Sequence, residues 1–361
     1  MSALRLTFVL PSLSPTGGAM VVWRHAGALR ARGHAVTVLG VKPPLAWPWQ
    51  PQAGLLARRW FYQRFVLDPR RGLERHGIAD VTREVARIDA RHVPEGDVIV
   101  ATSWETAEWV AGLDARHGRP VYFLQDYEAW EPRLEPRVDA TWRLPYTRIA
   151  VSQWLVDLAR TRFGLDSRGP VGNGVEWERF AGPSRRDPAR PVIGAVYHPS
   201  LGKGFDVLRE ALFAIAREHP DARFLVFGRT RPHDAFPAGT EYVWTPEWDE
   251  VPKLYRRMDV FLHASRREGW GLPPMEAMAA GCALVTTPTG GVPEFADATS
   301  AVFVPVGDAA ALAAAAGALL RDPARRAALG EAAATRMRGY GWGPVHDRLE
   351  AELREVARGA N

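Results

Sequence analysis

Residues 265–293 read SRREGWGLPPMEAMAAGCALVTTPTGGVP, which predicts a glycine-bearing loop, a helix and a strand in succession. The apolar run Val260–Ala264 just before this stretch is typical of a buried strand. Pro273 and Pro274 suit the first turn of the helix, because proline lacks the amide hydrogen that this turn leaves unbonded. A strand that leads into a helix in this way predicts a parallel sheet with a ligand site beyond the carboxyl ends of its strands.

The start of this helix favours an anionic ligand, because its free N–H groups carry partial positive charge. Gly269 and Gly271 have no side chain, so the backbone can approach a ligand closely. Glu268 on the loop and Glu276, expected in the first turn, offer acceptor oxygens that match sugar hydroxyls. Taken alone, each glutamate is better explained as a solvated residue or as a complement to the helix dipole.

Strands and helices alternate in the same way over most of the 361 residues. This alternation, in two series, predicts an α/β protein with two Rossmann-like, doubly wound parallel-sheet domains facing across a cleft. The predicted strands are Leu4–Leu13, Ala35–Val41, Asp97–Ser103, Pro120–Gln125 and Arg148–Ser152 in the first series, and Val192–Tyr197, Arg223–Phe227, Val260–Ala264 and Ala283–Thr287 in the second. The predicted helices are Ala19–Arg32, Gln153–Phe163, Phe205–His219, Pro252–Met258, one beginning at Pro273 and an amphipathic one at Val345–Val356.

Domain boundaries follow from the polar, proline-bearing stretch Ala181–Arg190, which is typical of a hinge. We expect an N-terminal domain over residues 1–182 and a C-terminal domain over residues 183–341. Residues 342–361 should form a C-terminal helix that packs back on the N-terminal domain.

Between Lys42 and Pro94 the alternation is lost, and the segment is rich in proline, tryptophan and arginine. Aromatic residues among basic ones can mark a peripheral membrane face, for example at Trp47, Trp49, Arg58, Arg59, Trp60, Phe61 and Arg64. We favour a partly buried insertion whose arginine stems lie on apolar surface. Pro11 and Pro15 break the first apolar run, so a signal peptide is not expected.

The net charge of +5 suits an anionic ligand, although a solvated basic surface explains it equally well. The single cysteine, Cys282, excludes an intrachain disulfide and fits the reducing cytoplasm. We therefore expect a cytoplasmic location and leave peripheral contact with the inner face of the membrane open.

Several motifs together resemble the retaining glycosyltransferase family 4, whose members have the GT-B fold of two Rossmann-like domains. Glu268 and Glu276, with GWGLPPM between them, resemble the paired-glutamate signature of that family. The resemblance covers nearly the whole chain in the family's order: Gly17-Gly18, Asn173-Gly174-Val175 with Phe180, Lys203-Gly204 with Phe205 and Leu208, Thr289-Gly290-Gly291, and Pro293-Glu294.

The resemblance implies a retaining, metal-independent glycosyltransferase that moves a sugar from a nucleotide diphosphate to a glycan, lipid-linked or small-molecule acceptor. It implies a role in surface polysaccharide assembly, with no cofactor beyond the nucleotide sugar. Glu276 would hold the ribose, Glu268 the transferred sugar, and Lys203 the leaving phosphate. The resemblance also implies which residues bind the sugar donor. They are Gly17 and Gly18 of the N-terminal domain and, in the C-terminal domain, His198, Lys203, Trp244, Thr245, Glu268, Gly269, Trp270, Gly271, Leu272 and Glu276.

Two positions depart from the family pattern. His198 stands where an arginine is common, so phosphate neutralisation would rest mainly on Lys203. Gln125 stands where the acceptor-side domain often has histidine, so any base role would fall to Asp126. The implied catalytic residues are thus Lys203, Glu268 and Asp126, and the implied acceptor-binding residues are Gln125, Asp126 and Glu128.

The run YFLQDYEAWE at residues 122–131 looks like a rhamnosyltransferase subgroup of the family. It favours a dTDP-rhamnose or GDP-mannose donor over UDP-sugars.

Other classes fit less well. No G-x-G-x-x-G follows the first strand, no Ser or Thr follows Gly202-Lys203, and no Cys/His group has zinc spacing. These absences disfavour a dinucleotide oxidoreductase, a P-loop NTPase and a zinc protein, and the dispersed basic residues disfavour a nucleic-acid binder. Two alternatives stay open: another GT-B enzyme acting on sugar nucleotides, and a catalytically idle paralogue within a glycan-assembly complex, which His198 and Gln125 favour.

Overall fold

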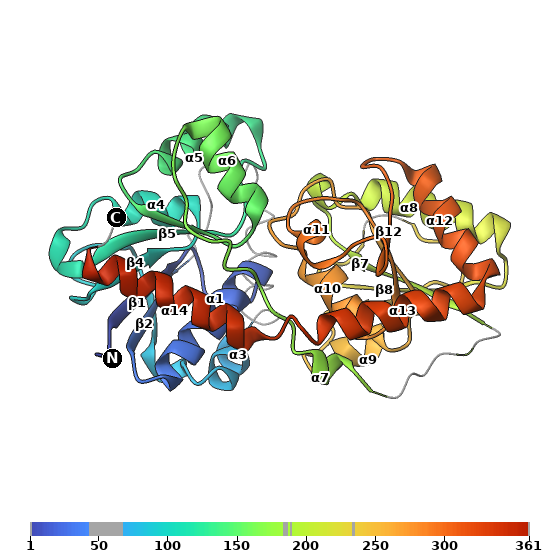
Figure 1. Ribbon diagram of the computed structural model, residues 1–361, viewed down its shortest axis with the longest axis horizontal. Helices are drawn as coiled ribbons and strands as arrows, with labels where there is room; N and C mark the ends of the chain where they lie inside the picture. Colours follow the sequence, from blue (N-terminus) through green and yellow to red (C-terminus); the bar gives the residue numbers. More distant parts are fainter. Residues whose placement is uncertain (1, 43–67, 183–186, 188–189, 233–234, 360–361) are drawn as a thin grey trace. The chain divides into compact units, whose positions relative to one another are not determined.

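The computed structural model describes residues 2–42, 68–182, 187, 190–232 and 235–359 (Figure 1). The aromatic and basic residues predicted to form a membrane face or an insertion at 47–64 lie outside these ranges. Two compact units are present, the first formed by Met1–Gly172 with Val345–Asn361 and the second by Asn173–Pro344.

The predicted domain boundary at residue 182 is wrong, because the second unit already begins at Asn173. The short helix α7 (Trp177–Phe180) packs against helices of the second unit, and Phe180 is buried in its core. Helix α14 (Trp342–Arg358) starts in the second unit and belongs to the first from Val345 onward. Within the first unit it packs through buried residues such as His346, which contacts His25.

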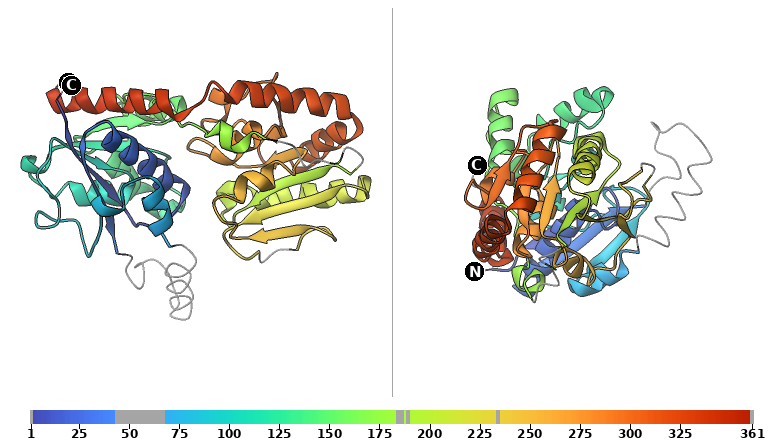
Figure 2. Two further views of the ribbon diagram at one scale, coloured as in Figure 1. Left: turned by 90° about the horizontal axis from the view of Figure 1, so that it is seen from below. Right: turned by 90° about the vertical axis from the view of Figure 1, so that its right-hand side faces the viewer.

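The first unit contains a six-stranded parallel sheet with the order β3-β2-β1-β4-β5-β6 (Figures 1 and 2). Its strands are β1 (Arg5–Leu10), β2 (Ala35–Val41), β3 (Thr82–Val85), β4 (Val98–Ala101), β5 (Arg119–Leu124) and β6 (Thr147–Ala150). Strand β3 lies inside the segment in which the sequence showed no alternation. It is an edge strand of four residues with no buried side chain, so its sequence does not show the alternation of apolar and polar residues that predicts a strand.

The helices of the first unit have capping residues at some of their ends. They are α1 (Gly17–Ala31), α3 (Arg70–Arg75), α4 (Trp104–Val110), α5 (Glu135–Trp142), α6 (Gln153–Phe163) and α14, with single 3₁₀ turns at Ala79–Val81, Ala115–His117 and Pro132–Leu134. The Thr16 side chain accepts from the N–H of Ala19 at the start of α1. Ser103 and Thr106 form a capping box on α4. Gly164, in the left-handed region, ends α6.

The second unit repeats the same architecture with a parallel sheet of order β12-β11-β10-β7-β8-β9. Its strands are β7 (Val192–Tyr197), β8 (Arg223–Gly228), β9 (Glu241–Trp244), β10 (Val260–His263), β11 (Ala283–Thr286) and β12 (Ala301–Phe303). Counted from its own first strand, each sheet has the doubly wound order in which the first strand lies beside the fourth. The predicted fold of two Rossmann-like domains is confirmed.

Helices cover both faces of the second sheet (Figure 2). They are α7, α8 (Phe205–Glu218), α9 (Val251–Tyr255), α10 (Leu272–Ala279), α11 (Val292–Phe295), α12 (Ala309–Arg321) and α13 (Pro323–Met337), with a 3₁₀ turn at Leu201–Lys203. Successive strand residues point to opposite faces, so neighbours enter different core layers. Val226 and Leu262 pack with residues of α8 and α12, whereas Leu225 and Phe261 pack with residues of α9 and α10.

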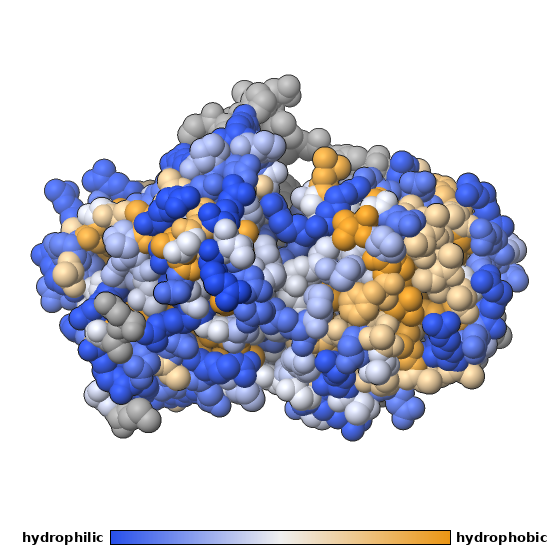
Figure 3. All heavy atoms as spheres, turned by 45° about the horizontal axis from the view of Figure 1, so that its top comes forward, coloured by the Kyte–Doolittle hydropathy of each residue, from blue (hydrophilic) through white to orange (hydrophobic). Residues whose placement is uncertain are grey.

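The visible surface of the first unit is mostly hydrophilic, while apolar side chains gather on that of the second (Figure 3). Within the described ranges, no helix combines the length and apolar character that a bilayer crossing requires.

Candidate functional site

The candidate site of the second unit lies on the two loops that leave β7 and β10. These strands are neighbours at the point where the strand order reverses, which is where open α/β sheets bind ligands. His198 and Lys203 follow β7, and Glu268 lies on the loop between β10 and α10. The fold therefore brings residues distant in sequence to one edge of the sheet.

Glu268 is the centre of a group of polar side chains. Its Oε2 accepts a hydrogen bond of 2.8 Å from Lys203 Nζ. Its Oε1 accepts from Ser265 Oγ at 2.7 Å and lies 3.2 Å from His263 Nε2. The Glu268 side chain is buried, with 8% exposure, whereas that of Lys203 is 38% exposed. The carboxylate is thus enclosed, and the ammonium it holds stays accessible from solvent.

The carboxyl group of Glu268 is ionised at neutral pH. Burial acts to raise its pKa, because desolvation penalises the charged form. The charge of Lys203 and the hydrogen bond from His263 outweigh this and hold the pKa well below its usual range. An ionised carboxylate at this place in turn keeps the charged Lys203 side chain oriented.

Two glycines allow the loops of the site to approach each other. Gly290, with φ +57°, lies so close to the loop after β10 that an added Cβ would be 1.9 Å from the carbonyl oxygen of Glu268. Gly204, with φ +64°, follows Lys203, and an added Cβ would lie 1.9 Å from the carbonyl oxygen of Ala264. Any side chain at either position would force the backbones apart, so these glycines fix where Lys203 and Glu268 meet.

Helix α10 begins at Leu272, with Gly271 as its N-cap at φ +105° and no side chain capping it. Pro273 and Pro274 have no N–H, so the backbone groups predicted to meet a diphosphate are those that lead into the helix, from Gly269 to Leu272. Trp270 is buried, and its ring lies 5.7 Å from that of Phe295 between centroids. The Trp270 side chain therefore belongs to the core, and at this position only backbone atoms can serve a ligand.

Glu276 lies just beyond the first turn of α10, in which it was predicted, because the helix starts at Leu272 and has no acidic residue in its first turn. Its carboxylate accepts a hydrogen bond from Tyr255 of α9. Burial raises the pKa of Tyr255 well above its usual value, and the charge of Glu276 raises it further. The bond to Tyr255 holds the Glu276 carboxylate on the α9 side of the helix.

His198 cannot replace the positive charge of the arginine that is common in the family. Its Nδ1 accepts from the N–H of Ser200 at 3.1 Å. Partial desolvation of the ring lowers its pKa below the usual value of 6.5, and the charge of Lys203 lowers it further. The ring is therefore neutral at pH 7, and the accessible positive charge at the end of β7 is that of Lys203.

Trp244 and Thr245 stand at the carboxyl end of β9, next to the end of β8. Trp244 is 38% exposed, and the guanidinium carbon of Arg231 lies 4.4 Å from the centroid of its ring. Thr245 has φ +50°, and its N–H donates to the carbonyl of Gly228 at 2.7 Å. Arg231 was not predicted from the sequence, since nothing in its neighbourhood indicates a partner on the next strand.

The residues predicted to bind the acceptor follow β5 in the first unit. The Gln125 side chain donates to the carbonyl of Thr102 at 3.2 Å, and an added Cβ on Gly18 would lie 3.4 Å from it. Asp126 accepts from the N–H of Tyr127 at 2.8 Å and from the indole of Trp130 at 3.3 Å. Gly18 and Gln125 are thus neighbours at the carboxyl edge of this sheet.

Glu128 lies on the same loop and accepts a hydrogen bond of 2.6 Å from the N–H of Trp104. Burial raises its pKa well above the usual value, and the nearby carboxylate of Glu105 raises it further. Burial and Glu105 thus favour the protonated form of Glu128 more than in an exposed glutamate, and that form can donate as well as accept a hydrogen bond.

Sequence reasoning missed His263 and Ser265, which both bond to Glu268. The register of β10 and β11 pairs His263 with Thr286, and their side chains are 2.8 Å apart. His263 is the last residue of a strand that borders the switch point, and this position is the signal that could have indicated it.

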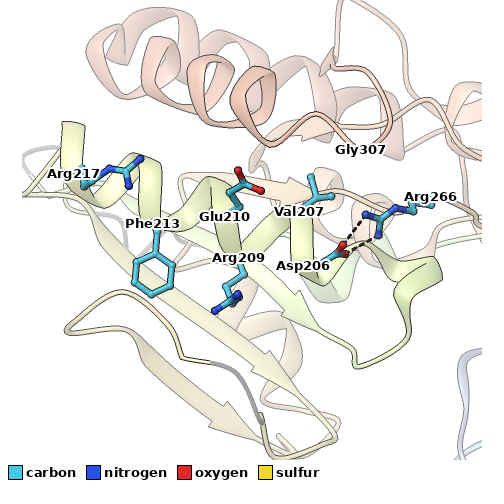
Figure 4. Close-up of a pocket in the computed structure, with 8 residues that line it drawn as sticks. All are labelled: Asp206, Val207, Arg209, Glu210, Phe213, Arg217, Arg266 and Gly307. Carbon is cyan, nitrogen blue, oxygen red and sulfur yellow. Dashed lines mark hydrogen bonds and ion pairs between the residues drawn. The ribbon is translucent and has the colours of Figure 1, made fainter.

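A separate pocket of about 580 Å³ lies along α8 (Figure 4). Arg266 closes one end of it through a double hydrogen bond to Asp206. Neither Lys203, Glu268 nor Glu276 lines this pocket, so it is not the candidate site.

Over the part of the chain that the structure describes, no three His, Cys, Asp or Glu side chains gather closely enough to hold a metal ion. That the reaction needs neither metal nor cofactor stays a prediction.

The two doubly wound sheets define a GT-B protein, and the solved structures agree. Sucrose-phosphate synthase from Thermosynechococcus elongatus superposes with a TM-score of 0.73 at 17% identity, covering 98% of this chain and 100% of that one. Anabaena Alr3699/HepE in complex with UDP-glucose superposes with a TM-score of 0.73 at 16% identity, covering 98% and 100%.

Comparisons of the amino-acid sequence indicate the family of enzymes that the chain resembles. Residues 190–322 match the family model described as "Glycosyl transferases group 1". The lipopolysaccharide core biosynthesis mannosyltransferase LpsB of Rhizobium meliloti is 29% identical over 180 residues, 43% of this chain and 51% of that protein. A D-inositol 3-phosphate glycosyltransferase of Segniliparus rotundus is 30% identical over 187 residues, 48% of this chain and 42% of that protein. The chain spans about half the length of the curated relatives that it matches. Residues 190–322 are thus similar to the group 1 glycosyltransferases, and these matches support a GT-B glycosyltransferase of family 4.

Proposed function

We propose that this chain is a retaining glycosyltransferase that moves a sugar from a nucleoside diphosphate to a hydroxyl group of a glycan or lipid-linked acceptor. The observation that carries the proposal is the accessible ammonium of Lys203, held 2.8 Å from the buried, ionised carboxylate of Glu268. A fixed positive charge beside a helix N-terminus suits a diphosphate.

The transfer breaks the bond between the anomeric carbon and the phosphate oxygen. Positive charge then develops on the sugar and negative charge on the diphosphate. Lys203 and the N–H of Leu272 at the start of α10, where Pro273 and Pro274 have none, would stabilise the departing diphosphate. The carboxylate of Glu268 would accept hydrogen bonds from the sugar and oppose its positive charge, and Glu276 would accept from the ribose hydroxyls.

The acceptor oxygen would form its bond to the anomeric carbon on the face that the phosphate leaves, which retains the configuration. Its proton would pass to the departing phosphate oxygen. Gln125, Asp126 and Glu128 of the first unit are proposed to bind the acceptor, with Asp126 as the base if a side chain serves as one. Positioning of the acceptor hydroxyl would supply much of the remaining acceleration.

Mannose as the transferred sugar is supported by LpsB, a lipopolysaccharide core mannosyltransferase, while other curated relatives are named D-inositol 3-phosphate glycosyltransferases. Together with the YFLQDYE run, this supports GDP-mannose or dTDP-rhamnose over a UDP-sugar as the donor. We further propose that the protein works in the cytoplasm on surface polysaccharides, with peripheral contact at the inner face of the membrane.

A second candidate function, a catalytically idle subunit of a glycan-assembly complex, is favoured by the neutral ring of His198 and by Gln125. Screening GDP-mannose, dTDP-rhamnose and UDP-sugars by thermal shift tests donor binding, because a ligand that binds only the folded state raises its stability. Hydrolysis or transfer of the stabilising donor by the purified chain would exclude the idle subunit. Binding without any turnover would exclude the transferase.

A further inference from the structure

His263 links a buried threonine to the carboxylate of the candidate site. The side chain is 8% exposed at the end of β10. Its Nδ1 lies 2.8 Å from Thr286 Oγ1 and its Nε2 lies 3.2 Å from Glu268 Oε1. Thr286 is fully buried on the neighbouring strand β11. The imidazole ring is therefore held from both ends inside the protein.

The partners of the ring assign a hydrogen to Nε2. An ionised carboxylate oxygen only accepts, so the nitrogen facing Glu268 must donate. On the other side, a neutral ring accepts the hydroxyl hydrogen of Thr286. A charged ring instead donates to Thr286, whose hydroxyl then donates to the carbonyl of Thr287 at 3.2 Å. Both arrangements give His263 an Nε2–H that points at Glu268 Oε1.

The two oxygens of Glu268 have partners of different kinds. Oε1 is bonded to Ser265 and faces His263, and both of these residues are buried. Oε2 is bonded to Lys203, whose side chain is 38% exposed. An incoming diphosphate can compete for the exposed ammonium, whereas the two buried donors are out of its reach.

We propose that His263 is a positioning residue of the donor site, which holds Glu268 by Oε1 while Lys203 turns from Oε2 to the donor diphosphate. Oε2 then becomes available to a hydroxyl group of the transferred sugar. His263 and Ser265 keep the carboxylate in place, and their hydrogen bonds keep it ionised in a buried position. This inference rests on the proposed function and extends it to the order in which the site exchanges partners.

His263→Leu tests the role by removing the Nε2 donor at similar volume. The expected result is a fall in kcat of about tenfold to a hundredfold, since a misplaced group near the reacting atoms has effects of this size. The Kd for the nucleoside diphosphate should stay close to that of the wild type, because Lys203 and α10 are unchanged. His263→Gln keeps an N–H donor and should restore most of the turnover.

His34 offers a matched control in the first unit, because it is also buried and its Nε2 lies 3.2 Å from a carboxylate oxygen, that of Glu350. His34→Leu should lower thermal stability and leave kcat unchanged. The inference is overturned if His263→Leu keeps wild-type kcat, or if it loses turnover only in proportion to folded protein and His263→Gln restores nothing.

A spectroscopic test does not depend on turnover. In protein labelled with ¹⁵N-histidine, the signals of His263 are those absent from the His263→Gln spectrum. We expect Nε2 to be protonated at pH 7, before and after addition of GDP, dTDP or UDP. An unprotonated Nε2 would overturn the inference. Absence of sugar transfer by the wild type would instead contradict the proposed function, so the two failures are distinguishable.

Discussion

Lys203 and Glu268 form an ion pair of 2.8 Å between side chains that are 65 positions apart in the sequence. The adjacency of β7 and β10 brings their loops together, and Gly204 and Gly290 allow the close approach. The pair is asymmetric, because the carboxylate is buried and the ammonium is accessible. A ligand can therefore reach the positive charge of Lys203 directly. It can reach the negative charge of Glu268 only after it displaces Lys203.

Glu276→Ala should weaken donor binding about tenfold or more, as expected for the loss of a charged hydrogen-bond acceptor. Isothermal titration calorimetry with the nucleotide sugar that gives the largest thermal shift measures the effect. Glu276→Gln separates binding from folding, because it keeps an acceptor for Tyr255. Glu331→Ala, an exposed residue of α13, is the matched control. Unchanged donor affinity in Glu276→Ala would remove this residue from the ribose site.

Gly290→Ala should destabilise the second unit more than Gly307→Ala does. Both glycines have positive φ, at +57° and +83°, so both variants carry the strain of about 1–2 kcal/mol that a left-handed residue costs. Only at Gly290 would the new Cβ also meet the carbonyl of Glu268, at 1.9 Å, whereas nothing lies within 4 Å at Gly307. Urea midpoints measure the difference. Equal midpoints would show that the close approach of these loops has no energetic consequence.

Asp126→Asn should reduce transfer to the acceptor and leave hydrolysis of the donor by water unchanged. The reason is that Asp126 lies in the first unit, while the proposed donor contacts of Lys203 and Glu268 are in the second. Comparing hydrolysis with transfer by the same preparation measures the split. Asp157→Asn, on the exposed side of α6, is the control. A parallel loss of both reactions would contradict an acceptor role.

The first unit should lose stability in mild acid because of a buried histidine pair, in which His25 Nδ1 lies 3.0 Å from His346 Nδ1. Burial, followed by the charge of Arg32, lowers the pKa of His346 to about 4, and burial also holds the pKa of His25 well below 6.5. Between about pH 6.5 and 4 the unfolded chain therefore binds more protons than the folded one, and stability falls as the pH falls.

His346→Leu removes one titrating group and should flatten the dependence of the urea midpoint on pH over this window. Arg24, Asp347 and His76 also act on the pair and remain in the variant. The partly exposed His92 supplies the control His92→Asn. An identical slope in wild type and His346→Leu would show that this pair does not set the acid sensitivity.

Helices and strands could be predicted from the sequence where a clear apolar periodicity coincides with residues that favour a helix or strand end. Helix α6 and strands β2 and β7 have the predicted bounds, because apolar periodicity and end residues such as Gly164 agree there. Strands β3 and β9 could not be predicted, since they lie at sheet edges, have four residues each and contain no buried side chain. Their pairing depends on a neighbouring strand that the local sequence does not indicate.

The candidate site likewise contains some residues that could be predicted from the sequence and others that could not. Lys203, Glu268 and Glu276 could be proposed from their order and spacing within a motif. The bond from His263 to Glu268 could not, because it depends on the β10–β11 register and on the fold of the loop after β10. The neutral state of His198 likewise follows from the desolvation of its ring and the nearness of Lys203, which only the folded chain shows.

Lys203 is proposed to bind and stabilise the diphosphate of a sugar donor. This role is tested by measuring turnover and donor binding in Lys203→Ala, in the wild type and in the control Lys253→Ala on α9. We predict that Lys203→Ala lowers kcat by about two to three orders of magnitude, in line with the loss of an electrostatic group that stabilises developing charge, while Lys253→Ala behaves as wild type. Near-wild-type turnover in Lys203→Ala, or no binding of any nucleoside diphosphate sugar by the wild type, would rule out this role of Lys203.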